Sequence, residues 1–245
     1  FTITVTTTGS PPHGSITPVT GPVTYGSTPI YSITPDTGYH IETATMDGDS
    51  ILGGKDPTGF DYQFASITTD HEIAATFSLN AYTITVSPGA HGDISPTTGQ
   101  VSYGDTPEYT ITADTGYHIE TATVDSSSVM GDLVNGVYHF ASVTDNHEIA
   151  ATFHINTYTI TVEHGANGNI TPDSGNFTYG QNSTYTITPN ANYHIETATN
   201  DGNSILLSLD GNGNYTYSGI GANHTLNATF AINVWTVTVT HGANG

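Results

Sequence analysis

The chain has 245 residues, of which 35% are hydrophobic, and a formal net charge of −21, with 22 Asp and Glu against a single basic residue, Lys55. So negative a surface repels phosphate backbones and anionic membranes, which argues against nucleic-acid binding and favours cations as counterions. There is no Cys, which excludes a disulfide framework and thiol chemistry, and no apolar stretch is long enough to span a membrane.

Internal repetition organises the chain into modules. Phe1-Thr2-Ile3-Thr4-Val5 opens the chain, and related strings begin at positions 82, 158 and 235. The string YHIETAT occurs at 39–45, 117–123 and 193–199, and HEIAATF occurs at 71–77 and 147–153, with a diverged copy at 224–230. We therefore predict three modules, at residues 1–80, 81–156 and 157–233. Residues 234–245 are the first strand of a truncated fourth module, or a strand exchanged with another subunit, and the chain is expected to be a piece of a longer array.

Each module is predicted to contain about six β-strands, because β-branched residues alternate with period two and helical periodicity is absent. In the middle module the predicted strands are residues 81–87, 91–96, 107–113, 117–125, 136–142 and 147–155. A turn precedes each YHIETAT string, so we predict positive φ at Gly38, Gly116 and Asn192. The predicted fold class is all-β: a tandem array of small antiparallel β modules, β-sandwich or β-grasp-like. Junctions of two or three residues favour a semi-rigid rod with contacts between neighbours only.

The combined motifs resemble the divergent internalin-type B-repeat of bacterial and archaeal surface proteins, over three full copies and the start of a fourth. In the middle module the residues that carry the resemblance are Gly92, Ile94, Pro96, Tyr103, Gly104, Ile111, Gly116, Tyr117, Ile119, His147, Ile149, Ala151 and Phe153. The resemblance implies an all-β module used in tandem as a stalk or adhesive segment of secreted, cell-wall or S-layer proteins, without catalytic residues. Two departures are the near absence of basic residues and the drift of the turn from Asp36-Thr37-Gly38 to Asn190-Ala191-Asn192.

The YHIETAT strings contain the first candidate metal ligands. In a strand the His and Glu of each string lie on one face, and imidazole and carboxylate both bind Zn²⁺. The pairs are His40 with Glu42, His118 with Glu120, and His194 with Glu196. A second histidine of each module (His71, His147, His224) could approach them. The interpretation that we favour is a solvent-facing polar pair, with the second histidine in a turn before the last strand.

Acidic loops are the second candidate, because Asp, Asn, Ser and carbonyl oxygens suit Ca²⁺. The candidate ligands are Asp47, Asp49, Asp125 and Asp201, in equivalent hairpins. These loops lack EF-hand spacing, and Asp-Gly is the ordinary spelling of a tight hairpin turn, so the turn interpretation is favoured. No cofactor is expected, and Ca²⁺ is the ion that the composition leaves open.

Six N-glycosylation sequons lie in the third module and none in the first two. They are Asn169, Asn176, Asn182, Asn214, Asn223 and Asn227. Glycosylation at them depends on whether the source organism modifies asparagine.

Catalytic motifs are absent from the sequence, so we expect no enzyme. The predicted function is an extracellular stalk, spacer or adhesive segment of a cell-surface protein or filament, anchored by a part of a longer parent protein. One alternative is a module that binds a glycan, a host protein or Ca²⁺ through its loops. Another is a subunit that assembles into a fibre by strand exchange. The expected partners are neighbouring repeats or copies of the chain, and cell-surface glycans or proteins.

Overall fold

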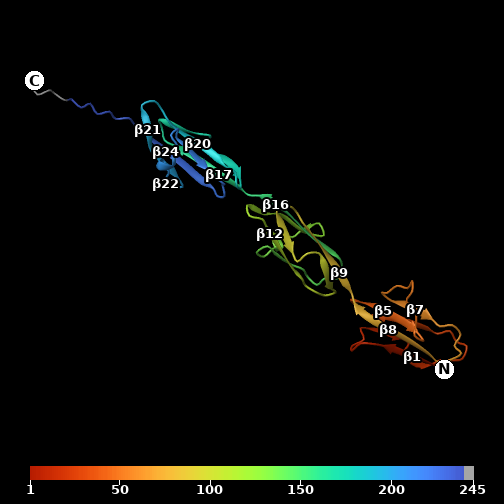
Figure 1. Ribbon diagram of the computed structural model, residues 1–245. Helices are drawn as coiled ribbons and strands as arrows, with labels where there is room; N and C mark the ends of the chain where they lie inside the picture. Colours follow the sequence, from red (N-terminus) through yellow and green to blue (C-terminus); the bar gives the residue numbers. More distant parts are fainter. Residues whose placement is uncertain (240–245) are drawn as a thin grey trace, which may run out of the picture. The chain divides into compact units, whose positions relative to one another are not determined.

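The computed structural model describes residues 1–239, and Figure 1 shows its modules in chain order. There are three modules, with the same succession of eight strands in each. The first module contains β1 (Thr2–Thr7), β2 (Gly14–Thr17), β3 (Gly21–Pro22), β4 (Ile30–Pro35), β5 (Tyr39–Met46), β6 (Asp49–Ser50), β7 (Phe60–Gln63) and β8 (His71–Leu79). The second contains β9 (Ala81–Pro88), β10 (Gly92–Ser95), β11 (Gly99–Ser102), β12 (Glu108–Ala113), β13 (Tyr117–Val124), β14 (Ser127–Ser128), β15 (Val137–His139) and β16 (His147–Ile155). The third contains β17 (Thr157–His164), β18 (Gly168–Thr171), β19 (Gly175–Thr178), β20 (Ser183–Pro189), β21 (Tyr193–Asn200), β22 (Asn203–Ser204), β23 (Asn214–Tyr217) and β24 (His224–Ile232).

The expected all-β, tandem-module fold class is confirmed. The six strands predicted for the middle module all form, and two short ones, β11 and β14, come in addition. These two strands contain glycine and serine, which are typical of turns. The alternation of apolar and polar residues therefore did not predict them as strands. Between residues 1 and 239 the only helical segments are two single 3₁₀ turns, η1 (Met130–Asp132) and η2 (Leu206–Ser208). No helix in this part of the chain has the length and apolarity needed to cross a membrane.

Each module consists of one five-stranded and one three-stranded sheet. In the first module their strand orders are β3-β1-β8-β5-β6 and β2-β4-β7, and the other two modules repeat both orders. The first and last strands of a module are parallel neighbours, with Ile3 facing His71 and Val5 facing Ile73. The pairs β9–β16 and β17–β24 are parallel as well. The expected antiparallel modules therefore each contain one parallel pair, at the centre of the five-stranded sheet.

The parallel pair follows from the topology of the module. Parallel neighbours need a long crossover, and the strands between the first and the last supply it. The consequence concerns the path of the chain. Two parallel strands begin at the same end of their sheet, so the chain enters a module at one end of the sheet and leaves it at the other.

The core of each module lies between its two sheets. In the first module Ile3 and Ile73 come from the five-stranded sheet and Tyr31 and Ile33 from the three-stranded sheet, and all four are nearly inaccessible to solvent. The third module has its own cluster around Ile160, Tyr185 and Leu226. Burial of one such aliphatic side chain stabilises the fold by about 1.5–3 kcal/mol. The fully buried residues within 1–239 are all hydrophobic, which the period-two pattern predicts.

The glycine of the Gly-x-Ile-x-Pro motif makes room for an aromatic ring of the last strand. A Cβ atom at Gly92 would lie 2.3 Å from the ring of Phe153, and one at Gly168 would lie equally close to Phe230. Distances this short are not tolerated, so the position requires glycine. The second glycine requirement is conformational, and it was predicted. Gly38, Gly116 and Asn192 have φ of 85°, 86° and 72° in the turn before β5, β13 and β21, which confirms the expectation.

The chain divides into two compact units, and the division runs through the second module. The first unit comprises Phe1–Pro88, Ile94–Ile111 and Thr121–Ala151, and the second comprises Gly89–Asp93, Thr112–Glu120 and the residues from Thr152 onward. The junction of modules one and two therefore lies inside the first unit, and that of modules two and three lies inside the second. The expected semi-rigid rod stays a prediction.

The segment after β24 has no regular secondary structure over residues 233–239. The side chains of Val234, Trp235, Val237 and Val239 in it are all exposed. The rest of the predicted fourth strand lies outside the described residues. Its assignment as a truncated fourth module or as an exchanged strand stays a prediction.

Candidate functional site

An aspartate–histidine pair joins the β5–β6 hairpin of the first module to β8. The hairpin turns at Asp47-Gly48, where φ is 50° and 86°. Positive φ at both central residues matches a type I′ turn and explains the Asp-Gly spelling. In this turn the Asp47 carboxylate lies beside the start of β8. Its Oδ2 is 2.6 Å from Nδ1 of His71, and its Oδ1 accepts the backbone N–H of Glu72 at 2.8 Å.

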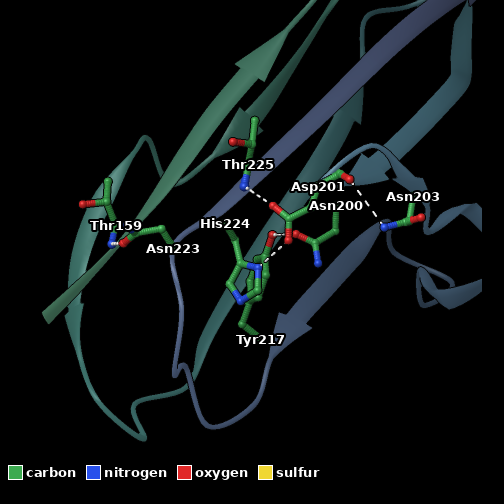
Figure 2. A network of polar contacts seen from close by, with 8 residues as sticks. All are labelled: Thr159, Asn200, Asp201, Asn203, Tyr217, Asn223, His224 and Thr225. Atoms are coloured by element: carbon green, nitrogen blue, oxygen red, sulfur yellow. Dashed lines mark hydrogen bonds and ion pairs between the residues drawn. The ribbon is translucent and has the colours of Figure 1, made fainter. Parts of the chain in front are cut away.

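The other two modules repeat the pair almost unchanged. Asp125 lies 2.6 Å from His147 and accepts the N–H of Glu148 at 2.9 Å. Asp201 lies 2.7 Å from His224 and accepts the N–H of Thr225 at 2.8 Å. Figure 2 draws both contacts as dashed lines. In the third module the network is wider. The Tyr217 hydroxyl donates to Oδ1 of Asn200 at 2.7 Å, and the Tyr217 ring lies 5.0 Å from that of His224.

These contacts favour the ionised form of each aspartate. The backbone N–H of Glu72 and then the His71 imidazole lower the pKa of Asp47 below its ordinary value. Glu148 and His147 lower the pKa of Asp125 in the same order, whereas for Asp201 the His224 hydrogen bond comes first and the Thr225 N–H second. Both oxygens of each carboxylate are bonded to groups of the last strand. Chemically the pair is therefore a clamp between a hairpin and the last strand.

The histidines of the YHIETAT strings have asparagine partners rather than glutamate partners. Nδ1 of His40 lies 2.9 Å from Oδ1 of Asn80, that of His118 lies 2.8 Å from Asn156, and that of His194 lies 3.0 Å from Asn233. A β-bulge after Ile41 and Ile195 interrupts the register at the glutamate of two modules. Oε2 of Glu120 and of Glu196 accept instead from Thr152 and Thr229, at 3.5 Å and 3.4 Å.

The candidate metal ligands therefore separate into different places. His71, His147 and His224 pair with Asp47, Asp125 and Asp201 and do not join the His–Glu strings. Asp49 lies on the exposed strand β6. Within residues 1–239 no three His, Asp or Glu side chains come together in an arrangement that could hold a metal ion. The Ca²⁺ and Zn²⁺ interpretations of these residues stay predictions.

The six sequons occupy two kinds of position. Asn169, Asn176, Asn182 and Asn223 are exposed, whereas Asn214 and Asn227 are half-buried. The side-chain amide of Asn214 donates to Asp210 at 2.8 Å and that of Asn227 donates to Glu163 at 3.1 Å, so both amide nitrogens are already engaged. Asn182 and Asn223 use their Oδ1 to accept the backbone N–H of Gly219 and Thr159. Exposure makes the other four the accessible candidates for glycosylation, although the amide nitrogen of Asn169 also donates, to Oγ1 of Thr171 at 3.2 Å.

The junctions between modules form a second repeated cluster, which we call the joint. A single residue, Asn80, separates β8 from β9. Its N–H donates to the carbonyl of Gly38 at 2.8 Å, and its own carbonyl accepts the N–H of Tyr103 at 2.8 Å. Its side chain holds His40. One asparagine thereby ties the turn of its own module to a loop of the next one.

The second joint repeats these contacts around Asn156, which separates β16 from β17. Asn156 donates to the carbonyl of Gly116 at 2.8 Å and accepts the N–H of Tyr179 at 2.9 Å. In both joints the tyrosine ring covers the turn glycine. A Cβ atom would lie 2.3 Å from the Tyr103 ring at Gly38 and 2.1 Å from the Tyr179 ring at Gly116.

The joint was missed in the sequence, although its signals were present. Asn80, Asn156 and Asn233 recur at the same place in each module, and so do the tyrosines at 25, 103 and 179. After the third module half of the joint is formed, because Asn233 donates to the carbonyl of Asn192 at 2.8 Å and holds His194. Here asparagine replaces the turn glycine.

Comparison with known proteins identifies the modules. A sequence model of the divergent InlB B-repeat domain matches residues 82–157 and 158–234, together more than half of the chain. Two solved structures are similar to this chain. One is the Bacillus anthracis TIE protein, with a TM-score of 0.30 and 9% identity over 88% of this chain. The other is the pilus adhesin SpaC of Lactobacillus rhamnosus GG in its open conformation, with a TM-score of 0.24 and 10% identity over 97% of this chain. This chain spans 57% and 44% of their lengths. No curated protein matches the sequence. With its repeated motifs, its shared sheet orders and the family match over two modules, the chain belongs to the divergent InlB B-repeat family.

Proposed function

We propose that the chain is an extracellular spacer segment of a cell-surface protein, in which B-repeat modules are coupled in series. The joint is the observation that carries this proposal. Each joint replaces a linker by one asparagine, and that asparagine bonds to both modules that it connects. A segment whose task is to transmit position along a chain needs such coupling between its modules.

The topology of the module supports the same function. The parallel first and last strands place entry and exit at opposite ends of each five-stranded sheet. A force applied to the two ends of a module therefore acts along β1 and β8, which are direct neighbours. The number of modules can change without any alteration of the module itself, which is the behaviour expected of a repeat array.

The Asp–His clamps support a structural role for the acidic hairpins rather than a catalytic one. Nδ1 of each histidine bonds to the aspartate of the hairpin, and both carboxylate oxygens of that aspartate bond to the last strand of the same module. We infer that the segment is not an enzyme. We place it outside the cell, with other B-repeats as its direct neighbours.

The experiment that tests this function is surface display. The chain is placed between a cell-wall anchor and a terminal epitope, and compared with a version that lacks the second module, residues 81–156, and with a Gly/Ser linker of equal residue number. A spacer predicts that binding of a large antibody-coated bead to the epitope falls when the module is removed. It should also fall below that of the intact chain with the flexible linker, because the span of a coil grows only as about the square root of its residue number.

Experiments on the purified chain can contradict the proposed function. Saturable binding of the purified chain to a glycan or a host-cell surface, lost on substitution of the exposed hairpin loops, would replace the spacer by a loop-mediated binding module. Ordered filaments of the purified chain in electron micrographs would favour self-assembly.

A further inference from the structure

Among residues 1–239, the second module alone has two exposed histidines that face each other. His118 lies on β13 and His154 on β16, which are neighbours in the five-stranded sheet. Their ring centroids are 5.8 Å apart, with the rings tilted by 57°. The other modules keep the first histidine and lose the second, because Ser78 faces His40 and Ala231 faces His194.

The hydrogen bonds of both rings select one tautomer of the neutral imidazole. Nδ1 of His154 lies 2.9 Å from the carbonyl oxygen of Ile155, which can only accept, so Nδ1 carries the proton. Nδ1 of His118 likewise donates to Oδ1 of Asn156 at 2.8 Å. In a neutral imidazole with a protonated Nδ1 the lone pair is on Nε2. Metal-binding histidines have this arrangement, in which an oxygen acceptor fixes the ring and leaves the other nitrogen as ligand.

We propose that His118 and His154 chelate one divalent transition-metal ion through their Nε2 atoms. Two imidazoles that share a tetrahedral Zn²⁺ at about 2.0–2.1 Å have ring centroids roughly 5–6 Å apart, which the observed pair matches. Imidazole selects Zn²⁺, Ni²⁺ and Cu²⁺ over Ca²⁺ and Mg²⁺.

With two protein ligands this is an open site, in which water completes the coordination. It is distinct from the clusters of three or more ligands that residues 1–239 lack. The net charge of −21 concentrates cations at the surface and favours occupancy. The bound ion would link β13 to β16 next to Asn156. It would therefore stabilise the part of the second module that contributes to the second joint.

The test is a ZnCl₂ titration of the whole chelator-treated chain in excess CaCl₂, which occupies carboxylates and leaves imidazoles available. Calorimetry gives the stoichiometry, and the imidazole resonances in NMR spectra identify the ligands. We expect one ion per chain, with the largest shifts at His118 and His154. His154→Ser, which copies the first module, should weaken binding by at least about tenfold, since loss of even an outer partner of a ligand costs 10–100-fold.

His139→Gln is the matched control. His139 is an exposed histidine of the same module, it pairs with Glu108, and Gln63 occupies its place in the first module. This variant should bind Zn²⁺ like the wild type. An affinity that is unchanged in His154→Ser, or no saturable Zn²⁺ binding at all, overturns the proposal. So does a stoichiometry of three that follows the Asp–His clamps.

A gain of function completes the test. Ser78→His places a second imidazole opposite His40, whose Nδ1 is already held by Asn80. This variant should bind two Zn²⁺ ions per chain. A variant that folds like the wild type and still binds only one ion would contradict the geometric basis of the site.

Discussion

At the scale of single residues, the aspartate of each hairpin has two tasks in one side chain. It adopts a left-handed backbone conformation, with φ near 50° in all three modules, and so forms the turn. Its carboxylate then reaches the last strand and bonds to a backbone N–H and an imidazole. Asp-Ser in the second module and Asp-Gly in the other two keep the aspartate, which indicates that the carboxylate is needed beyond the turn.

Removal of this carboxylate should weaken one module in a measurable way. We expect Asp125→Ala to lower the free energy of unfolding of the second module by about 1 kcal/mol, a value for hydrogen bonds to a charged group after allowance for its exposure. Asp125→Asn keeps a residue that tolerates positive φ and one acceptor oxygen, so it should cost less. Urea unfolding followed by NMR intensities of each module measures both. Equal losses for the two variants would show that the carboxylate charge alone matters and that the turn preference of the residue does not.

The same pair predicts a dependence of stability on pH. In the folded chain the Glu148 N–H and His147 lower the pKa of Asp125. A lowered folded-state pKa contributes stability that is complete above the unfolded value, about 3.9, and is lost as the pH falls through the folded value. The stability difference between the wild type and Asp125→Asn should therefore shrink as the pH falls below about 4. A difference that persists unchanged to about pH 2.5 would contradict this assignment.

At the scale of elements, the joint depends on a glycine that a neighbouring ring covers. The turn glycine has positive φ and no room for a Cβ atom, and both conditions hold at Gly38 and Gly116. Asn192 shows that asparagine satisfies the first condition in this turn, since its φ is 72°. The two requirements can therefore be separated by experiment.

Gly116→Asn should loosen the second joint and leave the second module folded. The Cβ atom would lie 2.1 Å from the Tyr179 ring, so the ring has to move away, whereas the backbone of the turn accepts asparagine. We expect shifted Tyr179 resonances and faster proteolysis near Asn156. Gly104→Asn is the control, because Gly104 also has positive φ and nothing lies within 4 Å of the added atom. Equal rates of cleavage in the two variants would show that the Tyr179 ring does not stabilise the joint.

Most strands and the turns before β5, β13 and β21 could be predicted, since period-two alternation and glycine punctuation are local signals. The parallel pairing of β1 with β8 could not, because both strands have the same pattern whichever way their neighbour runs. The hydrogen-bond partners of His40 and His71 could not be predicted from the sequence either. Asn80 is forty residues from His40, and a bulge displaces Glu42, so the rule that residues i and i+2 share a face did not identify the partner.

At the scale of the whole molecule, the modules share a backbone design and differ in their surfaces. Each has a hydrophobic core of its own, as the separate clusters around Ile73 in the first module and Leu226 in the third illustrate. The joints add a few hydrogen bonds and one ring per junction. The stability of the chain should therefore be a sum of module terms with weaker coupling between neighbours.

A single core substitution tests this division. Ile149 in β16 is fully buried, and Ile149→Ala should destabilise the second module by about 2–5 kcal/mol, which is a large part of the stability of so small a domain. We expect the second module to unfold first in urea. The midpoints of the first and third modules should fall only slightly, because each of these modules loses one joint when the second module unfolds. The equivalent variant Ile73→Ala should shift the effect to the first module. Module-resolved NMR intensities read both out. A single transition that moves all three modules together would mean that the joints couple the modules as strongly as the cores hold them.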